Sequence, residues 1–321
     1  MNQVFQPQIS IVIPIYNDEK GLTQLFSKIE ETIEQANIDA EFVLVDDGSG
    51  DRSAEIILNK ALSDQRYYSI TLSRNFGQQM SVSVGLKKAR GTKAIMILDS
   101  DLQDPPEMII EYLKYIDKGY DVVYGVRKKR KENFLKIFLF WIYYRIFNSI
   151  SNYKIPVDSG DFSMLSRRVV DIINEMPEKS RFLRGMRSWI GFKQKGIIYE
   201  RQERKIGISQ YSVSKYLKLA SDSFFGFSDI PIKLISRIGL CVVITSFIYV
   251  VYLILKKLFW GGTLEGYTSI MTALILFSGV QLISIGIIGE YVHRIFLQSQ
   301  DRPLYIIDKE IKNLKKEENL S

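Results

Sequence analysis

KAIMILDSDLQDPPE, residues 93–107, contains three structural signals in one stretch. Its apolar beginning, Lys93 to Leu98, is typical of a short buried strand. An acidic turn follows, and Pro105 and Pro106 then favour the first turn of a helix, which we predict over Pro106 to Lys118. The stretch therefore predicts a strand, a polar turn and a helix in succession.

The same succession recurs on both sides of this stretch. The other apolar runs that we predict as strands are Ile9 to Pro14, Glu41 to Val45, Tyr67 to Leu72 and Asp121 to Tyr124. The helical patterns between them are Glu19 to Ala36, Ser53 to Leu62 and Gln78 to Ala89. Strands that alternate with helices favour an α/β fold, here a Rossmann-like, mostly parallel sheet with helices on both faces.

Ligands of such sheets bind beyond the carboxyl ends of the strands, so the residues at those ends are the candidates for chemistry. They are Pro14, Tyr16 and Glu19, then Asp46 and Asp47, then Arg74 and Asn75, and finally Asp99, Asp101 and Gln103. Neither GxGxxG nor GxxxxGK[ST] occurs in the chain, which excludes a dinucleotide phosphate loop and a P-loop.

The acidic pair Asp99 and Asp101 flanks one small residue at the end of a predicted buried strand. Two carboxylates so close repel each other unless a cation lies between them. Mg²⁺ or Mn²⁺ suits such a pair, because these ions combine one or two carboxylates with substrate phosphates. The alternative is helix capping by Asp101 or Asp104 ahead of the two prolines.

Two uncharged runs near the C-terminus, Ile238 to Leu255 and Tyr267 to Gly289, predict a membrane hairpin with its turn at Trp260 to Gly266. As a helix, the first run reaches about 27 Å, close to the roughly 30 Å of a bilayer core. The alternative is a pair of buried core helices. Basic residues at the outer ends of the hairpin outnumber those near its turn, which places both termini in the cytoplasm. They are Lys233, Arg237, Arg294 and Arg302, against Lys256 and Lys257.

The composition narrows the chemistry further. Lys and Arg total 43 against 36 Asp and Glu, a formal net charge of +7, and we expect no nucleic-acid partner. One cysteine, Cys241, excludes an internal disulfide and a cysteine-based zinc site. The lone histidine, His293, argues against a Ser-His-Asp triad. The first ten residues lack the pattern of a signal peptide, so we expect the mass of the protein in the cytoplasm.

Several segments together carry a family resemblance. In order they are IPIYNDE, LVDDGSGD, LSRNFGQQ, LDSDLQDPPE, VYGVR, SGDFSML and RFLRGMRSWIGF. The chain resembles glycosyltransferase family 2 from about Ile9 to about Pro303, and within it the bacterial polyprenyl-phosphate glycosyltransferases, relatives of dolichyl-phosphate mannose synthase. The resemblance implies a GT-A catalytic domain over residues 1–230, a hairpin over 231–295 with helices at about 235–257 and 267–290, and a cytoplasmic tail over 296–321.

The resemblance also implies roles for single residues. Uracil and ribose would be held by Pro14, Tyr16, Glu19 and Asp47, with Asp46, Arg74 and Asn75 nearby. The cation would be held by Asp99, Asp101 and Gln103. Arg127 would contact the phosphates, and Asp161 would face the sugar and the acceptor. An acceptor loop at about 199–225 nominates Arg201, Arg204 and Ser209. Ser163 and Gln210 stand where the family often has Arg and Lys, so the lipid phosphate is left to Arg201, Arg204, Lys205 or Arg145.

The implied activity is an inverting, metal-dependent transfer of a sugar, with glucose slightly ahead of N-acetylglucosamine, from UDP to polyprenyl phosphate at the bacterial plasma membrane. An interfacial helix at about 133–150 would hold the anionic lipid. A processive polysaccharide synthase and a non-catalytic nucleotide-sugar-binding protein are the alternatives. Two membrane helices are too few for a synthase pore within one chain, and a sensor needs no acceptor site. The sequence leaves a homo-oligomer open.

Overall fold

The computed structural model describes residues 6–127, 159–179, 181–200, 230–260 and 266–312. The chain divides into two compact units: one contains the sheet and includes the residues from Arg302 onward, and the other contains the two long C-terminal helices.

The sheet unit begins with strands and helices in alternation. Its strands are β1 (Ile9–Ile15), β2 (Ala40–Asp46), β3 (Tyr67–Leu72), β4 (Ala94–Ile97), β5 (Val122–Arg127), β6 (Ser159–Ser166), β7 (Gln194–Tyr199) and β8 (Ile307–Lys312). Its helices are α1 (Glu19–Gln35), α2 (Ser53–Ser63), α3 (Gln78–Lys88), α4 (Met108–Asp117), α6 (Arg167–Glu175) and α7 (Leu183–Ile190). The five strands and four helices that we predicted up to Tyr124 are all present, with ends that differ by at most a few residues.

The described strands form one sheet in the order β7-β5-β6-β4-β1-β2-β3-β8. Pairing is parallel between β1 and β2, β1 and β4, β2 and β3, and β5 and β7, whereas β6 runs antiparallel to both β4 and β5. The predicted α/β class with a mostly parallel sheet is therefore confirmed.

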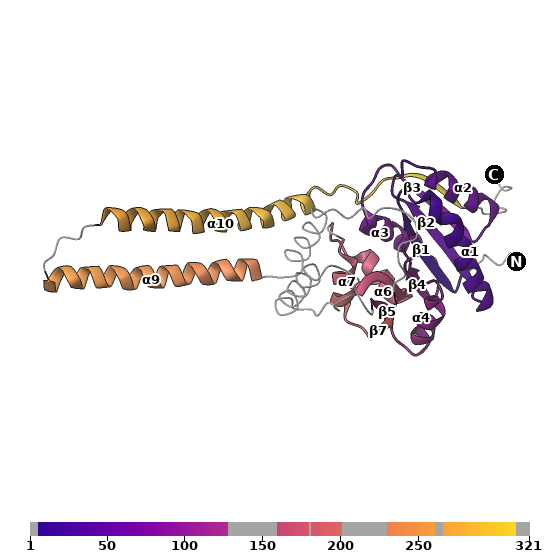
Figure 1. The fold of residues 1–321 in the computed structure, drawn as a ribbon, viewed down its shortest axis with the longest axis horizontal. Coiled ribbons are helices and arrows are strands. Elements are labelled where there is room, and N and C mark those ends of the chain that lie inside the picture. Colours follow the sequence, from indigo (N-terminus) through magenta and orange to yellow (C-terminus); the bar gives the residue numbers. More distant parts are fainter. Residues whose placement is uncertain (1–5, 128–158, 180, 201–229, 261–265, 313–321) are drawn as a thin grey trace. The chain divides into compact units, whose positions relative to one another are not determined.

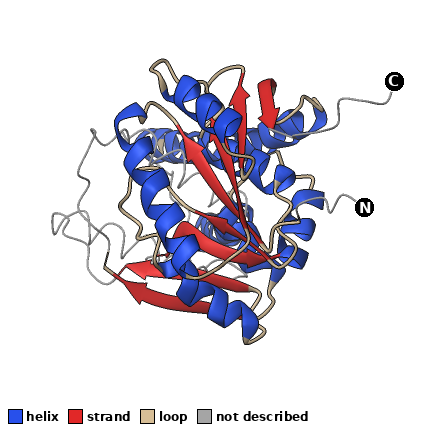
Figure 2. Cartoon of the chain, turned by 90° about the vertical axis from the view of Figure 1, so that its right-hand side faces the viewer, coloured by secondary structure: helices blue, strands red, loops and turns tan. Residues whose placement is uncertain are grey.

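Helices cover both faces of the sheet (Figures 1 and 2). The odd-numbered side chains of β1, from Ile9 to Ile15, pack with α1, α2 and α4 in one apolar core. On the opposite face, α3 lies close to β1, and a Cβ atom at Gly85 would lie 2.2 Å from Cγ1 of Val12. Strand residues alternate between faces, and β1 is apolar except for Ser10 because both faces are buried.

The C-terminal segment contributes the edge strand β8, which pairs antiparallel with β3. Glu310 of β8 accepts a hydrogen bond from the hydroxyl of Tyr68 and forms an ion pair with Nζ of Lys88 at 2.7 Å. From the sequence we predicted only a cytoplasmic tail for this region. Its six-residue strand covers the edge of β3, which would otherwise expose unpaired backbone groups.

Replacement of Glu310 by Ala is expected to destabilise the sheet unit by about 1–2 kcal/mol, because it removes a hydrogen bond and a half-exposed ion pair. Thermal unfolding would measure the loss. Asp308→Ala, an exposed position on the same strand, is the matched control. Equal melting temperatures for Glu310→Ala and the wild type would contradict a stabilising role for the Glu310 contacts with Tyr68 and Lys88.

The second unit consists of α9 (Ile230–Trp260) and α10 (Tyr267–Ser299), which contact each other (Figure 1). Both predicted apolar runs are therefore helical, and the chain between them covers the predicted turn. Among the described residues, the stretch Phe277–Ser299 is long and apolar enough to cross a bilayer, and Gly239–Tyr249 is a shorter apolar stretch.

Candidate active site

The strand order brings the predicted site residues that follow the strands to one edge of the sheet. The carboxyl ends of β1, β2, β4 and β5 share this edge because these strands run in the same direction. Strand β6 runs the other way, so its first residues reach the same edge. Since Ile97 of β4 pairs with Ser163 of β6, the continuing register places Asp161 across from the turn that begins at Asp99.

The acidic turn after β4 is held by specific hydrogen bonds. Nε2 of Gln78 donates to Oδ1 of Asp99 at 2.8 Å, and the backbone N–H of Gln103 donates to Oδ1 of Asp101 at 3.1 Å. Leu102 has a φ of 56°, in the left-handed region that a bulky residue rarely adopts. Such backbone strain concentrates at functional sites.

Asp161, which is 7% exposed, lies in a polar network that the sequence does not reveal. Arg184 of α7 donates to both of its oxygens, at 2.8 Å to Oδ1 and 3.1 Å to Oδ2, and Nε2 of Gln79 donates to Oδ2 at 3.0 Å. Burial alone would raise the pKa of Asp161, but the charge and hydrogen bonds of Arg184 outweigh it and hold the pKa below its usual value. Asp161 is therefore a fixed anion at neutral pH.

Arg127 lies beside Asp161. A Cβ atom at Gly160 would lie 3.0 Å from Nη2 of Arg127, so the guanidinium covers the backbone just before Asp161. Nε of Arg127 donates to the hydroxyl of Tyr199 at 3.5 Å, and that hydroxyl donates to Oδ1 of Asp104 at 2.5 Å. Burial acts to lower the pKa of Arg127, but Tyr199 and Asp104 raise it above its usual value. Asp104 thus holds the guanidinium of Arg127 in place through the hydroxyl of Tyr199.

At the end of β1 the predicted nucleotide residues differ in their surroundings. Pro14 is buried within the strand, and Tyr16 is exposed. Glu19 joins the first turns of α1 and α2: its backbone N–H donates to Oδ2 of Asp51, and its Oε2 accepts from the backbone N–H of Arg52. Glu19 therefore has a structural contact that the sequence analysis did not predict.

The two aspartates at the end of β2 are both buried. Oxygens of Asp47 accept the backbone N–H groups of Phe76 and Gly77 at 2.8 and 2.9 Å, which fixes the loop ahead of α3. Oδ1 of Asp46 is buried with no hydrogen-bond partner among the residues that the structure describes. Burial raises the pKa of both carboxyl groups. A buried acceptor of this kind is suited to a donor from a ligand.

The loop after β3 is exposed at Arg74 and Asn75. The Arg74 guanidinium lies 4.1 Å from the ring centre of Phe76, a cation–π contact. Gln78 and Gln79, at the start of α3, were not predicted as site residues, yet they donate hydrogen bonds to Asp99 and Asp161. Both stand in the quoted segment LSRNFGQQ, but nothing in its local pattern indicates which acids they contact.

Five predicted acceptor residues lie outside the described residues: Arg145, Arg201, Arg204, Lys205 and Ser209. The same holds for the predicted interfacial helix at 133–150 and for the acceptor loop beyond residue 200. These assignments stay predictions.

The donor set at the acidic turn fits a divalent cation that completes its coordination with substrate. Asp99 and Asp101 are half-buried, and each is held through Oδ1 by a bond from Gln78 or from the Gln103 backbone. The described part of the chain contains no group of three or more His, Cys, Asp or Glu residues placed to hold a metal. Two carboxylates are nevertheless enough for Mg²⁺ or Mn²⁺ when phosphates and water supply the other ligands.

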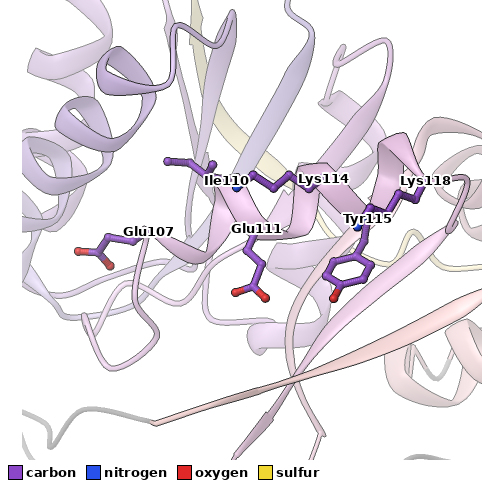
Figure 3. A pocket seen from close by; sticks show the side chains of 6 residues that line it. All are labelled: Glu107, Ile110, Glu111, Lys114, Tyr115 and Lys118. Atoms are coloured by element: carbon purple, nitrogen blue, oxygen red, sulfur yellow. The ribbon is translucent and has the colours of Figure 1, made fainter.

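A shallow groove lies elsewhere, along α4 (Figure 3). Its lining residues are Glu107, Ile110, Glu111, Lys114, Tyr115 and Lys118. None of these six residues is among the predicted site residues.

The chain is similar to known proteins along most of its length. Residues 10–173 match Glycosyl transferase family 2, and residues 230–295 match the GtrB C-terminal hairpin. An uncharacterized glycosyltransferase of Bacillus subtilis is 41% identical, over 98% of each chain. A bactoprenol glucosyl transferase of Shigella phage SfV is 36% identical, over 94% of this chain and 99% of the relative.

Among solved structures, glucosyl-3-phosphoglycerate synthase of Mycobacterium tuberculosis, in complex with Mn²⁺, UDP-glucose and phosphoglyceric acid, is 14% identical with a TM-score of 0.41, over 68% of this chain and 77% of that one. A likeness this distant supports no statement about the ligands of this chain. The family match and the close relatives are sufficient for assignment: the chain belongs to glycosyltransferase family 2, is a glycosyltransferase, and has the C-terminal hairpin of the GtrB type.

Proposed function

We propose that the protein transfers a sugar, with glucose first among the candidates, from UDP to polyprenyl phosphate, with inversion at the anomeric carbon. One observation carries the proposal: a single sheet edge assembles an acidic pair suited to a cation with a second, arginine-bound carboxylate, Asp161. The relative named bactoprenol glucosyl transferase, matched over 94% of this chain, supports the lipid acceptor and the sugar.

On the donor side, the uridine is surrounded in this proposal by Tyr16, Glu19, Asp46 and Asp47. Pro14, Arg74 and Asn75 lie at the margin of the uridine site. Oδ1 of Asp46 is the buried acceptor for a ligand donor. Asp99, Asp101 and Gln103 hold Mg²⁺ or Mn²⁺, which when bound neutralises charge on the diphosphate. Arg127 is directed at the same developing charge.

On the acceptor side, the lipid phosphate attacks the anomeric carbon and UDP leaves from the opposite face. Asp161 does not act as a base in this proposal, because its lowered pKa makes the carboxylate a weak proton acceptor and both of its oxygens already accept hydrogen bonds. It orients the acceptor and stabilises positive charge at the sugar ring. The nucleophile needs little deprotonation, since a phosphate monoester has its second pKa near 6.

The hairpin supports a site at a membrane. Apolar side chains of α10 are exposed around the helix, including Leu282 at 70%, Ile283 at 65% and Ile285 at 56%. Such side chains in water are unfavourable by about 25 cal/mol per Å² of apolar surface. We propose a bacterial plasma-membrane protein with residues 1–230 on the cytoplasmic side and residues 231–295 in the bilayer.

The direct test combines purified protein, a divalent cation and UDP-glucose or UDP-N-acetylglucosamine, with and without undecaprenyl phosphate. UDP release that requires the lipid, with one sugar per lipid by mass spectrometry, supports the proposal. A product with many sugars would indicate a processive synthase. Nucleotide-sugar binding without any release would indicate a sensor.

The pH dependence gives a second prediction. The pKa of Asp161 is lowered, so it stays ionised well below neutral pH, and activity is expected to fall only as the acceptor phosphate protonates, at about pH 6. The rate of Asp161→Asn is expected to be lower at every pH. The fall of its pH–rate profile on the acidic side is expected at the same pH as in the wild type. If the rate of Asp161→Asn no longer fell at acidic pH, Asp161 would instead be the base whose protonation lowers the rate.

A further inference from the structure

The first turn of α3 contacts both carboxylates that flank the proposed reaction. Gln78 and Gln79 are neighbours in sequence, yet Gln78 donates to Asp99 at 2.8 Å and Gln79 donates to Asp161 at 3.0 Å. In the proposed function the two acids have different neighbours: Asp99 lies beside the cation and the diphosphate, and Asp161 lies beside the sugar and the acceptor. One helical turn therefore holds both.

The orientation of the Gln79 amide is fixed from its other end. Its Oε1 accepts the backbone N–H of Leu183 at 3.0 Å, so Nε2 has to face Asp161. A flip of the amide would place a donor against the N–H of Leu183 and an acceptor against a carboxylate, and would lose both bonds. Gln79 thus joins α3, β6 and the first residue of α7.

The base of the turn is equally fixed. Asp47, at the end of β2, accepts the N–H groups of Phe76 and Gly77, immediately before α3. Gly77 has a φ of 96°, a left-handed conformation that favours glycine and sets the direction in which the helix starts. The turn that presents Gln78 and Gln79 is thereby attached to the sheet.

From these contacts we infer that Gln78 and Gln79 are positioning residues that set the separation between the donor-side carboxylate Asp99 and the acceptor-side carboxylate Asp161. The inference rests on the proposed function for the roles of the two acids. Without these amide donors each carboxylate gains rotational freedom, and a misplacement of about 1 Å in such a site lowers a rate by about 100-fold.

The two positions are expected to affect different constants. Gln79→Glu keeps an acceptor for the Leu183 N–H but replaces the donor to Asp161 by a carboxylate oxygen that repels it, so kcat is expected to fall about 10- to 100-fold, with KM for the UDP-sugar changed less than about twofold. Gln78→Met removes the donor to Asp99, so Mn²⁺ binding in the presence of UDP, measured by calorimetry, is expected to weaken by about tenfold.

The matched control is Gln35→Met on α1, where an exposed glutamine donates to Oε1 of Glu31 at 3.1 Å, and no constant is expected to change. Melting temperatures of all three variants are measured alongside. A lower kcat in Gln79→Glu together with weaker Mn²⁺ binding in Gln78→Met supports the inference. Unchanged constants in both variants, or equal losses of both constants that follow a lowered melting temperature, overturn it.

Sugar transfer by the wild-type protein distinguishes a failure of this inference from a failure of the proposed function. If wild-type protein transfers no sugar to polyprenyl phosphate, the proposed function fails. Mn²⁺ binding by Gln78→Met still tests the positioning of Asp99 in that case, because the measurement needs only UDP and the cation.

Discussion

Asp101→Asn is expected to lower the turnover number by about 100-fold or more, the scale for the loss of one group that stabilises transition-state charge. Asp101 belongs to the acidic turn after β4, and its Oδ1 accepts the Gln103 N–H. Asparagine keeps the size and that acceptor but removes the charge. The neutral side chain binds a divalent cation more weakly, so the diphosphate becomes a poorer leaving group.

The measurement is the steady-state rate of UDP release at saturating Mg²⁺ or Mn²⁺, together with a titration of the cation. Glu107→Gln is the control, because this exposed acid stands just after the same turn. Near-normal turnover of Asp101→Asn with the cation bound would falsify the assignment of Asp101.

Arg184→Met is expected to have the second large effect. The substitution leaves Asp161 buried without its bidentate partner, and such a loss costs about 3–5 kcal/mol. The melting temperature is expected to fall by about 10 °C. Activity is lost as well, because Asp161 is then held only by Gln79 among the donors described above and its pKa rises with burial.

The sign of the pH effect follows from the lowered pKa of Asp161. The ion pair stabilises the folded protein above the unfolded pKa of about 3.9, and this contribution is lost as pH falls through the lower folded value. The difference in stability between wild type and Arg184→Met is therefore constant above the raised pKa of Asp161 in the variant. It narrows as pH falls, first because the variant binds a proton at Asp161 and then because the wild type loses its ion pair.

Two further variants control this result. Arg184→Met combined with Asp161→Asn removes the carboxylate charge that has lost its bidentate partner and is expected to recover part of the stability but none of the activity. Arg52→Met breaks the exposed pair with Glu55, and its melting temperature is expected to stay near that of the wild type because water screens such a pair. A melting temperature for Arg184→Met equal to that of Arg52→Met would show that the buried pair does not stabilise the fold.

The elements up to β5 and the two C-terminal helices were predictable because each has a local signature. Strands buried on both faces read as continuous apolar runs, such as Lys93 to Leu98, and uncharged runs of hairpin length are rare in soluble domains. The family resemblance, carried by motifs at the strand ends, is confirmed. The acidic pair and Asp161 were singled out by the same motifs.

The direction of β6, the addition of β8 and the partners of each acid were not predictable in this way. Nothing in SGDFSML indicates a strand antiparallel to β4, and nothing in IDKEIK indicates pairing with β3, because pairing is a relation between distant segments. Gln79 and Arg184 are 82 and 23 residues from Asp161 along the chain. Local periodicity thus accounts for the elements and the edge at which chemistry occurs, whereas the arrangement that keeps Asp161 charged and fixed exists only once the chain has folded.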